Sequence, residues 1–257
     1  MGSDHDLSAE LDAAQRRVQE HPAFRELLEL QALRVSLTGV FNQNHLELMQ
    51  LLDRAAHDSE LAIELMQNVR EPIVADRFKA QVTQRLHNYV ASAKSLVDHV
   101  RHLMRGREGP IPEEFEKRKA DLLSHPEVPF LGDLRNYTLH RALPFLGTRV
   151  SMINENTPEE GLAGEIRLSV ASLLEWDRWT APARAFMVDQ RDVVPLMPVV
   201  DRHGRMVFEL NAWLHHELSL ANAPAMDELD ELIIQQNMIM TGGDREMAER
   251  RARRDFT

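Results

Sequence analysis

One long uninterrupted helical pattern constrains the fold of this chain most. From Pro72 to Arg105, apolar residues recur with a period near 3.6 residues. A helix over this segment would be roughly 50 Å long at the usual rise per residue. Gly106, Gly109 and Pro110 follow it and stop the helix. Because so long a helix needs packing partners along its whole length, the pattern predicts a mainly α-helical bundle with one long central helix.

Shorter helical patterns surround this central segment. Apolar residues at helical spacing in residues 8–57 predict several short helices in sequence. Two more helices are predicted after the break, one beginning at Pro112 and one covering about Phe130 to Leu143, before Pro144. Helical patterning returns over residues 181–221, and we expect those helices to close the bundle.

The period of the apolar residues changes to two in residues 145–173. One alternating run contains Thr148, Val150 and Met152, and a second contains Ile166, Leu168 and Val170. A Thr-Pro-Glu-Glu-Gly turn region joins the two runs. We predict a small two-stranded β-hairpin here. Since an isolated hairpin is only marginally stable, it must pack on the helices or pair with a second copy.

The length of 257 residues fits one large domain with an appendage. We predict a single helical domain over residues 1–221, followed by a C-terminal tail or appended helices over 222–257. The tail is first acidic, then apolar, then broken by glycines, and finally basic. It is either a solvated segment or an interaction arm for a protein partner that uses the arginines of its end, Arg250, Arg251, Arg253 and Arg254.

Composition excludes several classes of protein. The formal net charge of -11 argues against a protein that coats nucleic acid through its overall field, so any RNA contact must be local. The absence of cysteine excludes disulfides, thiolate metal sites and a cysteine nucleophile. The acidic amino terminus does not fit a signal peptide, and no run of apolar residues is long enough to span a membrane. We therefore expect a cytoplasmic protein with no membrane association.

Arginine followed after a short spacer by histidine is the one pattern that suggests a chemistry. Three pairs fit a spacer of four to six residues, namely Arg16 with His21, Arg118 with His125, and Arg135 with His140. Chance predicts about as many, so the bare spacing carries little information. His21 and His125 each precede a proline, which places them at the ends of elements. Only the third pair lies inside a predicted helix.

The sequence RNYTLH at residues 135–140 resembles the signature of the HEPN superfamily of helical proteins. The match covers these six residues, and a helical frame over about 72–144 loosely. The resemblance implies a metal-independent endoribonuclease without a cofactor, of toxin–antitoxin or phage-defence type, with an RNA substrate and two motifs facing each other across a homodimer. An antitoxin or other partner would bind the C-terminal tail. Arg135, Asn136 and His140 carry over as the catalytic residues, with Asp98 and Tyr137 in support.

Two features depart from the family. The predicted hairpin is not part of the minimal HEPN bundle, and no nucleotidyltransferase partner segment accompanies the motif.

The chemistry of these residue types suits RNA cleavage. A histidine titrates near neutral pH and can take a proton from a 2′-hydroxyl group, as we expect of His140. A fixed guanidinium, that of Arg135, can stabilise the charge that accumulates on the phosphate. Asn136 lies one helical turn before His140 and shares its face. Residues five apart are about 140° apart around a helix, so Arg135 and His140 of one chain do not point in the same direction. They can act together only if the long arginine side chain bridges the gap or a second copy of the chain supplies one of them.

The alternative is a structural role for the same residues. Arg135 would then pair with an acidic residue of the long helix, such as Asp98, because structural ion pairs imitate catalytic sites. The chain would be a non-catalytic helical protein that dimerises or binds a partner.

Other candidate sites are weaker. Asp98 with His99 and His102, or His215 with His216, lacks the register of a metal site, and we predict none. Trp176 and Trp179 could stack on a base, but paired tryptophans more often anchor a core.

Overall fold

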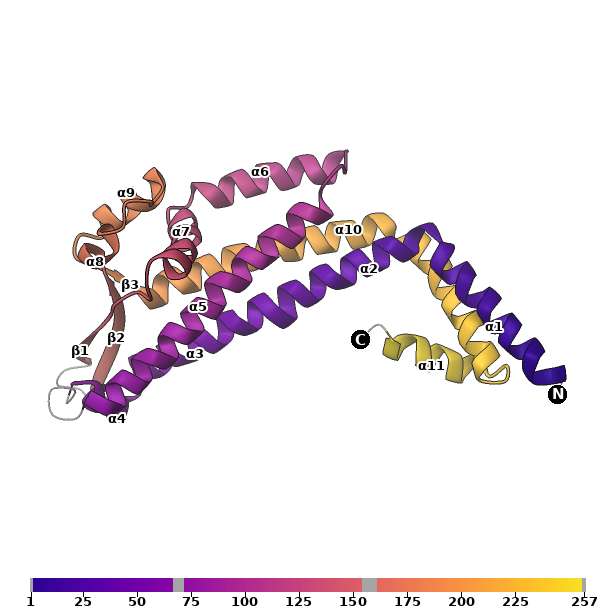
Figure 1. The fold of residues 1–257 in the computed structure, drawn as a ribbon, viewed down its shortest axis with the longest axis horizontal. Coiled ribbons are helices and arrows are strands. Elements are labelled where there is room, and N and C mark those ends of the chain that lie inside the picture. Colours follow the sequence, from indigo (N-terminus) through magenta and orange to yellow (C-terminus); the bar gives the residue numbers. More distant parts are fainter. Residues whose placement is uncertain (1, 67–71, 154–160, 256–257) are drawn as a thin grey trace. The chain divides into compact units, whose positions relative to one another are not determined.

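The computed structural model describes residues 2–66, 72–153 and 161–255. The protein is mainly helical and carries one small antiparallel sheet (Figure 1). The chain forms two compact units. We call residues 36–212 the central unit, and residues 1–35 together with 213–257 the terminal unit. The prediction of one domain over residues 1–221 followed by a tail stays a prediction.

The central unit contains most of the helices. Its elements before the sheet are η1 (Val35–Asn42), a π-helix, followed by α3 (Gln43–His57), α4 (Ser59–Met66), α5 (Pro72–Leu103), α6 (Pro110–Ser124) and α7 (Glu127–His140). Helix α5 confirms the predicted long helix and ends two residues before the predicted end. Helix α6 begins at Pro110, two residues before the predicted start at Pro112, and a proline is favoured in a first helical turn. Helix α7 ends at His140, three residues before the predicted end at Leu143.

The sheet has three strands, so the prediction of a two-stranded hairpin was wrong in its strand number. Strand β1 (Leu146–Ile153) pairs antiparallel with β2 (Gly161–Ser169), with Leu146 opposite Leu168. Strand β3 (Val193–Pro195) adds to the other edge of β2. Three residues are too few to show an alternating pattern, and they lie in a segment predicted to be helical. The predicted turn region between the first two strands lies mainly outside the described residues.

Helices α3 and α4 pack against the sheet (Figure 1). Gly164 of β2 makes this close approach possible, since a Cβ atom there would lie 2.9 Å from the carbonyl oxygen of Ala55 in α3. After Ser169 the chain turns into α8 (Val170–Leu174), and the Ser169 hydroxyl accepts a hydrogen bond from the Ser172 backbone amide at 3.3 Å. The predicted second strand was therefore too long at its C-terminal end.

An aromatic cluster joins α7 to α8 and α9 (Ala181–Asp189). Tyr137 stacks on Trp179 with ring centroids 5.6 Å apart, and Trp176 meets both rings edge-on. Phe130 stacks on Trp179 with ring centroids 6.0 Å apart and makes a tilted contact with Phe186 at 4.9 Å. All five side chains are buried, and the Trp179 indole donates a 2.7 Å hydrogen bond to the Leu173 carbonyl. Trp176 and Trp179 thus anchor a core, which was one of the two roles expected for them.

A second buried cluster joins η1, α3 and α5 to the first part of α10 (Leu196–Met240). The Tyr89 hydroxyl lies 2.5 Å from Nδ1 of His203, and both residues are buried. The rings of His45, Phe41 and Tyr89 contact one another, with His45 6.5 Å from Phe41 and 5.6 Å from Tyr89, and 5.7 Å between Phe41 and Tyr89. These aromatic contacts hold the middle of α5 in the core of the central unit.

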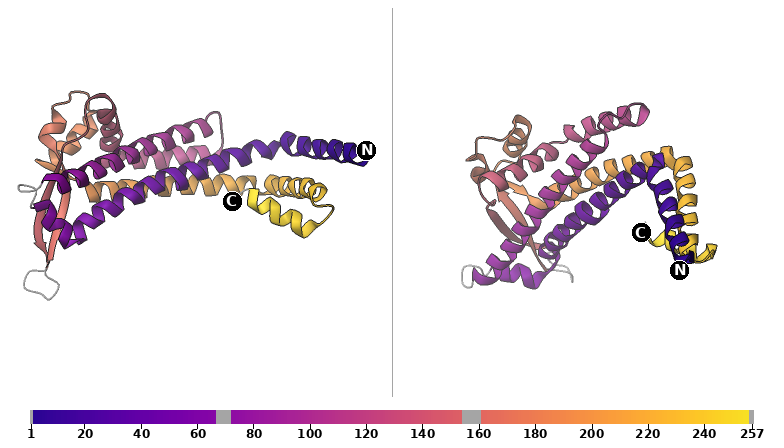
Figure 2. Two further views of the ribbon diagram at one scale, coloured as in Figure 1. Left: turned by 60° about the horizontal axis from the view of Figure 1, so that its bottom comes forward. Right: turned by 45° about the vertical axis from the view of Figure 1, so that its right-hand side comes forward.

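The terminal unit combines both ends of the chain. It contains α1 (Gly2–Glu20), α2 (Pro22–Arg34), the C-terminal part of α10, and α11 (Arg245–Asp255). Helix α1 and the end of α10 run side by side in both views of Figure 2. A small apolar core of Val18 in α1, Ala23 in α2, and Leu229 and Ile233 in α10 joins the three helices. Helix α10 continues through residue 222, where the tail was predicted to begin, and contains Pro224. None of the helices in the described part of the chain is long and apolar enough to cross a membrane.

Candidate functional site

Helix α7 carries the Arg135 motif and is held firmly along one face. Phe130, Leu131, Leu134 and Tyr137 are buried, at most 4% exposed, and the helix packs on α5, α6 and α9. At its first turn, buried Glu127 forms a 3.0 Å ion pair with Arg202 of α10. This packing fixes which side of α7 faces solvent, because a helix cannot rotate without exposing its apolar face.

Asp133 ties the middle of α7 to α9. Its carboxylate accepts two 2.7 Å hydrogen bonds from Thr180, one from the backbone amide and one from the hydroxyl. Thr180 is the residue before α9, and its own side chain makes no capping bond. The carboxylate of Asp133 therefore supplies the cap from a neighbouring helix.

Arg135 and Asn136 are joined at the half-buried edge of α7. The Arg135 Nη1 atom donates a 3.2 Å hydrogen bond to Oδ1 of Asn136. The Nε atom of Arg135 is buried and has no hydrogen-bond partner. Among the residues that the structure describes, Arg135 forms no ion pair with a carboxylate. A guanidinium held by one neutral amide keeps donors available for an anion.

His140 is the last residue of α7 and is exposed. The helix ends there because the Arg141 and Ala142 amides both bond to the Tyr137 carbonyl. No hydrogen bond links His140 to Arg135 or Asn136 within the described chain. The fold thus brings two of the three predicted catalytic residues into contact and leaves the third free in solvent at the end of the same helix.

Asp98 of α5 does not pair with Arg135. Its carboxylate binds Lys94 at 2.6 Å and Arg101 at 3.0 Å, both on its own helix. The hydrogen bond from Lys94 lowers the pKa of Asp98 below its usual range, and the more distant charge of Arg135 adds a smaller effect. The expected structural partner of Arg135 is therefore occupied elsewhere. Tyr137, the second predicted supporting residue, is buried in the aromatic cluster, where its role is to hold the helix.

No group of three or more His, Asp or Glu residues in the described parts of the chain could hold a metal ion. His99 of α5 is hydrogen-bonded through Nδ1 to the Ser36 hydroxyl in η1. His215 lies in the terminal unit and lines a pocket there.

Exposed apolar side chains surround the end of α7, a feature that the sequence reasoning missed. Leu139, Leu143 and Phe145 are 46, 63 and 67% exposed. The sequence suggested a helix to Leu143, which would have put Leu139 and Leu143 on one helical face. The sequence did not show that α7 ends at His140, and so the exposure of these side chains was not predicted. Large exposed apolar side chains so close together in the sequence make this end of α7 a candidate interaction surface.

Comparison with known proteins identifies no relative, since no family model, no curated protein and no solved structure matches this chain. An assignment of function to α7 therefore rests on the geometry of the described residues.

Proposed function

We propose that this protein is a metal-independent endoribonuclease of HEPN type whose site is the solvent-facing edge of α7. The observation that carries the proposal is the state of Arg135. Its guanidinium is half-buried, bonded to Asn136 at 3.2 Å, and not neutralised by a described carboxylate. A structural arginine at such a position is normally paired, because an unpaired buried charge is costly. A phosphate group of RNA would supply the missing partner.

The proposed reaction needs one proton acceptor and one phosphate ligand. Oxygen of the 2′-hydroxyl attacks the neighbouring phosphorus, the bond from phosphorus to the 5′-oxygen breaks, and a 2′,3′-cyclic phosphate forms. His140 accepts the proton of the attacking hydroxyl or gives one to the leaving 5′-oxygen. Arg135 binds the phosphate oxygens as their charge increases, and Asn136 holds the guanidinium in place. No metal enters these steps.

A second copy of the chain completes the site in this proposal. The reaction requires both an acceptor and a donor of protons, and one motif has a single histidine. The exposed side chains of Leu139, Leu143 and Phe145 lie beside His140 in the sequence and support a contact between copies at this end of α7. An isologous dimer brings the same residues of both copies together across a two-fold axis.

The same apolar residues favour the alternative of a non-catalytic protein that dimerises or binds a partner through the end of α7. An antitoxin or other protein partner that binds the C-terminal tail is compatible with both functions. Part of the positive charge of α11 is already paired, since Arg250 binds Glu246 of the same helix at 2.5 Å and Arg245 binds Glu231 of α10 at 2.9 Å. The two functions differ in RNA cleavage, because only the endoribonuclease cleaves RNA and needs Arg135 and His140 to do so.

The test is cleavage of varied RNAs by purified protein in excess chelator. Arg135→Ala and His140→Ala should each reduce the rate at least about a hundredfold, as expected when a positioned proton-transfer or charge-stabilising group is removed. Arg118→Ala and His102→Ala are matched controls of the same residue types on α6 and α5, and they should keep the wild-type rate. Equal cleavage by all variants, or none by the wild type, would favour the partner-binding protein. Circular dichroism must show that each variant is folded.

A further inference from the structure

The terminal unit contains a pocket that the α7 site does not use. Its volume is about 730 Å³, and residues of α2, α10 and α11 line it. Known sites for small molecules fall mostly between about 300 and 1,000 Å³. All lining residues belong to the terminal unit. The pocket is therefore large enough for a ligand of drug-like or metabolite size.

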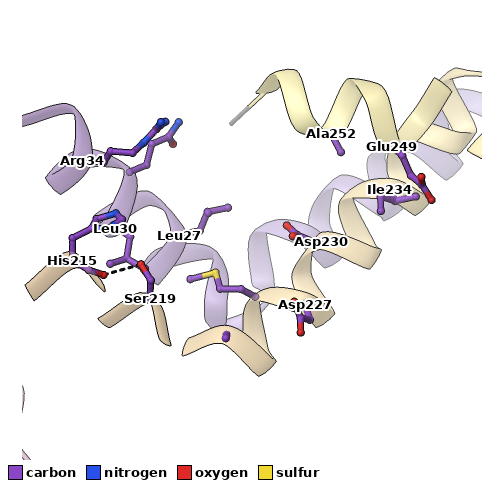
Figure 3. A pocket seen from close by; sticks show the side chains of 13 residues that line it. Leu27, Leu30, Arg34, His215, Ser219, Asp227, Asp230, Ile234, Glu249 and Ala252 are labelled. Carbon is purple, nitrogen blue, oxygen red and sulfur yellow. Dashed lines mark hydrogen bonds between the residues drawn. The ribbon is translucent and has the colours of Figure 1, made fainter. Parts of the chain in front are cut away.

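The middle of the pocket is apolar. Leu27 and Leu30 of α2 and Met226 and Ile234 of α10 line it, and Leu27 and Met226 also pack on the small apolar core of the terminal unit. Figure 3 shows Leu27 directed toward the space that α2, α10 and α11 enclose. An apolar wall with a few polar groups is the usual composition of a small-molecule site, since the wall supplies affinity and the polar groups fix orientation.

Two carboxylates of α10, Asp227 and Asp230, stand at this apolar wall. They are three residues apart and so lie on the same side of the helix. Neither forms an ion pair with a described residue. Glu249 of α11 also lines the pocket, but it is bound to Arg245 at 2.9 Å. Partial burial, and secondly the charge of Asp227, raise the pKa of Asp230, although both side chains are still exposed to solvent. The two carboxylates thus repel each other, and a cation between them would remove that repulsion.

The opposite end of the pocket has the reverse charge. Arg34 of α2 lies there, next to His215 of α10, as Figure 3 shows. Burial, and secondly the positive charge of Arg34, lower the pKa of His215. A cationic group would be repelled from Arg34 and attracted to Asp227 and Asp230. The charge distribution therefore fixes the direction in which a ligand with one cationic end would bind.

We propose that this pocket binds a small amphipathic organic cation, an amine or amidine on an alkyl or aryl body. The cationic group contacts the Asp227 and Asp230 carboxylates, and the apolar body lies on Leu27, Leu30 and Met226. This ligand site is separate from the α7 site and does not depend on RNA cleavage.

The test uses 4-phenylbutylamine and its neutral counterpart 4-phenylbutanol as probes, titrated into the full-length protein by calorimetry or followed by ligand NMR. The amine should bind saturably with one site per chain. The alcohol should bind at least about fivefold more weakly, because it lacks the charge that the carboxylates attract. The Asp227→Asn/Asp230→Asn double variant should reduce amine affinity about tenfold and leave the alcohol unchanged.

Asp12→Asn is the matched control, since Asp12 is an exposed carboxylate on α1 outside the pocket. It should leave the amine affinity unchanged. Equal binding of amine and alcohol, the same loss of affinity in the Asp12→Asn variant, or no saturable binding of the amine at millimolar concentration would each overturn the proposal. Isosteric Asp→Asn changes at surface positions keep the fold, and circular dichroism checks this.

Discussion

The imidazole ring of His45 in α3 occupies the space that a side chain at Gly204 of α10 would need. A Cβ atom at position 204 would lie 2.3 Å from Nε2 of His45, which is far closer than real carbon contacts allow. Gly204 therefore lets α10 approach α3 at the level of the buried Tyr89 and His203 pair. The close approach of these two helices depends on the absence of one methyl group.

Gly204→Ala should destabilise the protein by about 1–3 kcal/mol, because the added methyl group overpacks the core against His45. Gly132→Ala on α7 is the matched control, since a Cβ atom there meets nothing within 4 Å. It should stabilise the protein by about 0.5–1 kcal/mol through better helix propensity. Urea unfolding of both variants measures the difference. A Gly204→Ala variant as stable as the control would mean that α3 and α10 are not in close contact.

His203 should make stability depend on pH below neutrality. Burial, and then the nearby His45, lower the pKa of His203 from 6.5 to about 4. Since the folded pKa lies below the unfolded one, the neutral form is the one that the fold favours. The stability that neutral His203 adds to the fold is complete above pH 6.5 and is lost as the pH falls toward 4. The free energy of unfolding should fall by about 2 kcal/mol between pH 7.5 and 5 through this group alone.

Urea unfolding at both pH values measures this loss. His203→Asn should be less stable at pH 7.5, because it changes the bond to Tyr89, but should lose less stability on acidification than the wild type. His57→Asn, at an exposed position on α3, is the control and should keep the wild-type pH dependence. If the wild type and His203→Asn lost equal free energy, His203 would not be buried in its neutral form.

Asp133→Ala should lower stability by about 1–2 kcal/mol, because Thr180 at the start of α9 would lose its capping acceptor. Thermal unfolding detects the change. Asp121→Ala, at an exposed position of α6, should have little effect. Equal midpoints for the two variants would show that the contact between α7 and α9 does not need this carboxylate.

Phe145→Ser should shift a homodimer toward monomer if the end of α7 is the contact between copies, because the large exposed apolar side chain is lost. Light scattering after size exclusion measures the mass over a range of concentrations. Leu123→Ser, also exposed but on α6, should keep the wild-type mass. A wild type that is monomeric at all concentrations would exclude the dimeric site.

Local patterns explain which parts of the fold could be predicted from the sequence. Helix α5 and the pairing of β1 with β2 were predictable, because the apolar residues of these segments recur every 3.6 and every 2 residues over a short stretch of sequence. Strand β3 was not predictable, since its three residues form a strand only because they pair with the edge of β2. The continuity of α10 was also missed, because Pro224 and the polar residues before it indicate a break.

The candidate site shows the same limit. Arg135, Asn136 and His140 lie within six residues, so a motif could locate them. Lys94, the partner of Asp98, lies one turn away on the same helix. Tyr137, in contrast, is buried by Trp176 and Trp179, which are distant in sequence and which no local pattern determines. The cluster of His45, Tyr89 and His203 comes from three helices and left no signal in the sequence at all.

The most direct test of the proposed catalytic role of α7 is the end chemistry of RNA cut by the wild type and by His140→Ala in excess chelator. We predict that the wild type leaves 2′,3′-cyclic phosphate and 5′-hydroxyl ends, and that folded His140→Ala protein leaves no such ends above background. Cyclic phosphate ends produced equally by His140→Ala would contradict the role of His140. No cleavage by the wild type would contradict the endoribonuclease itself.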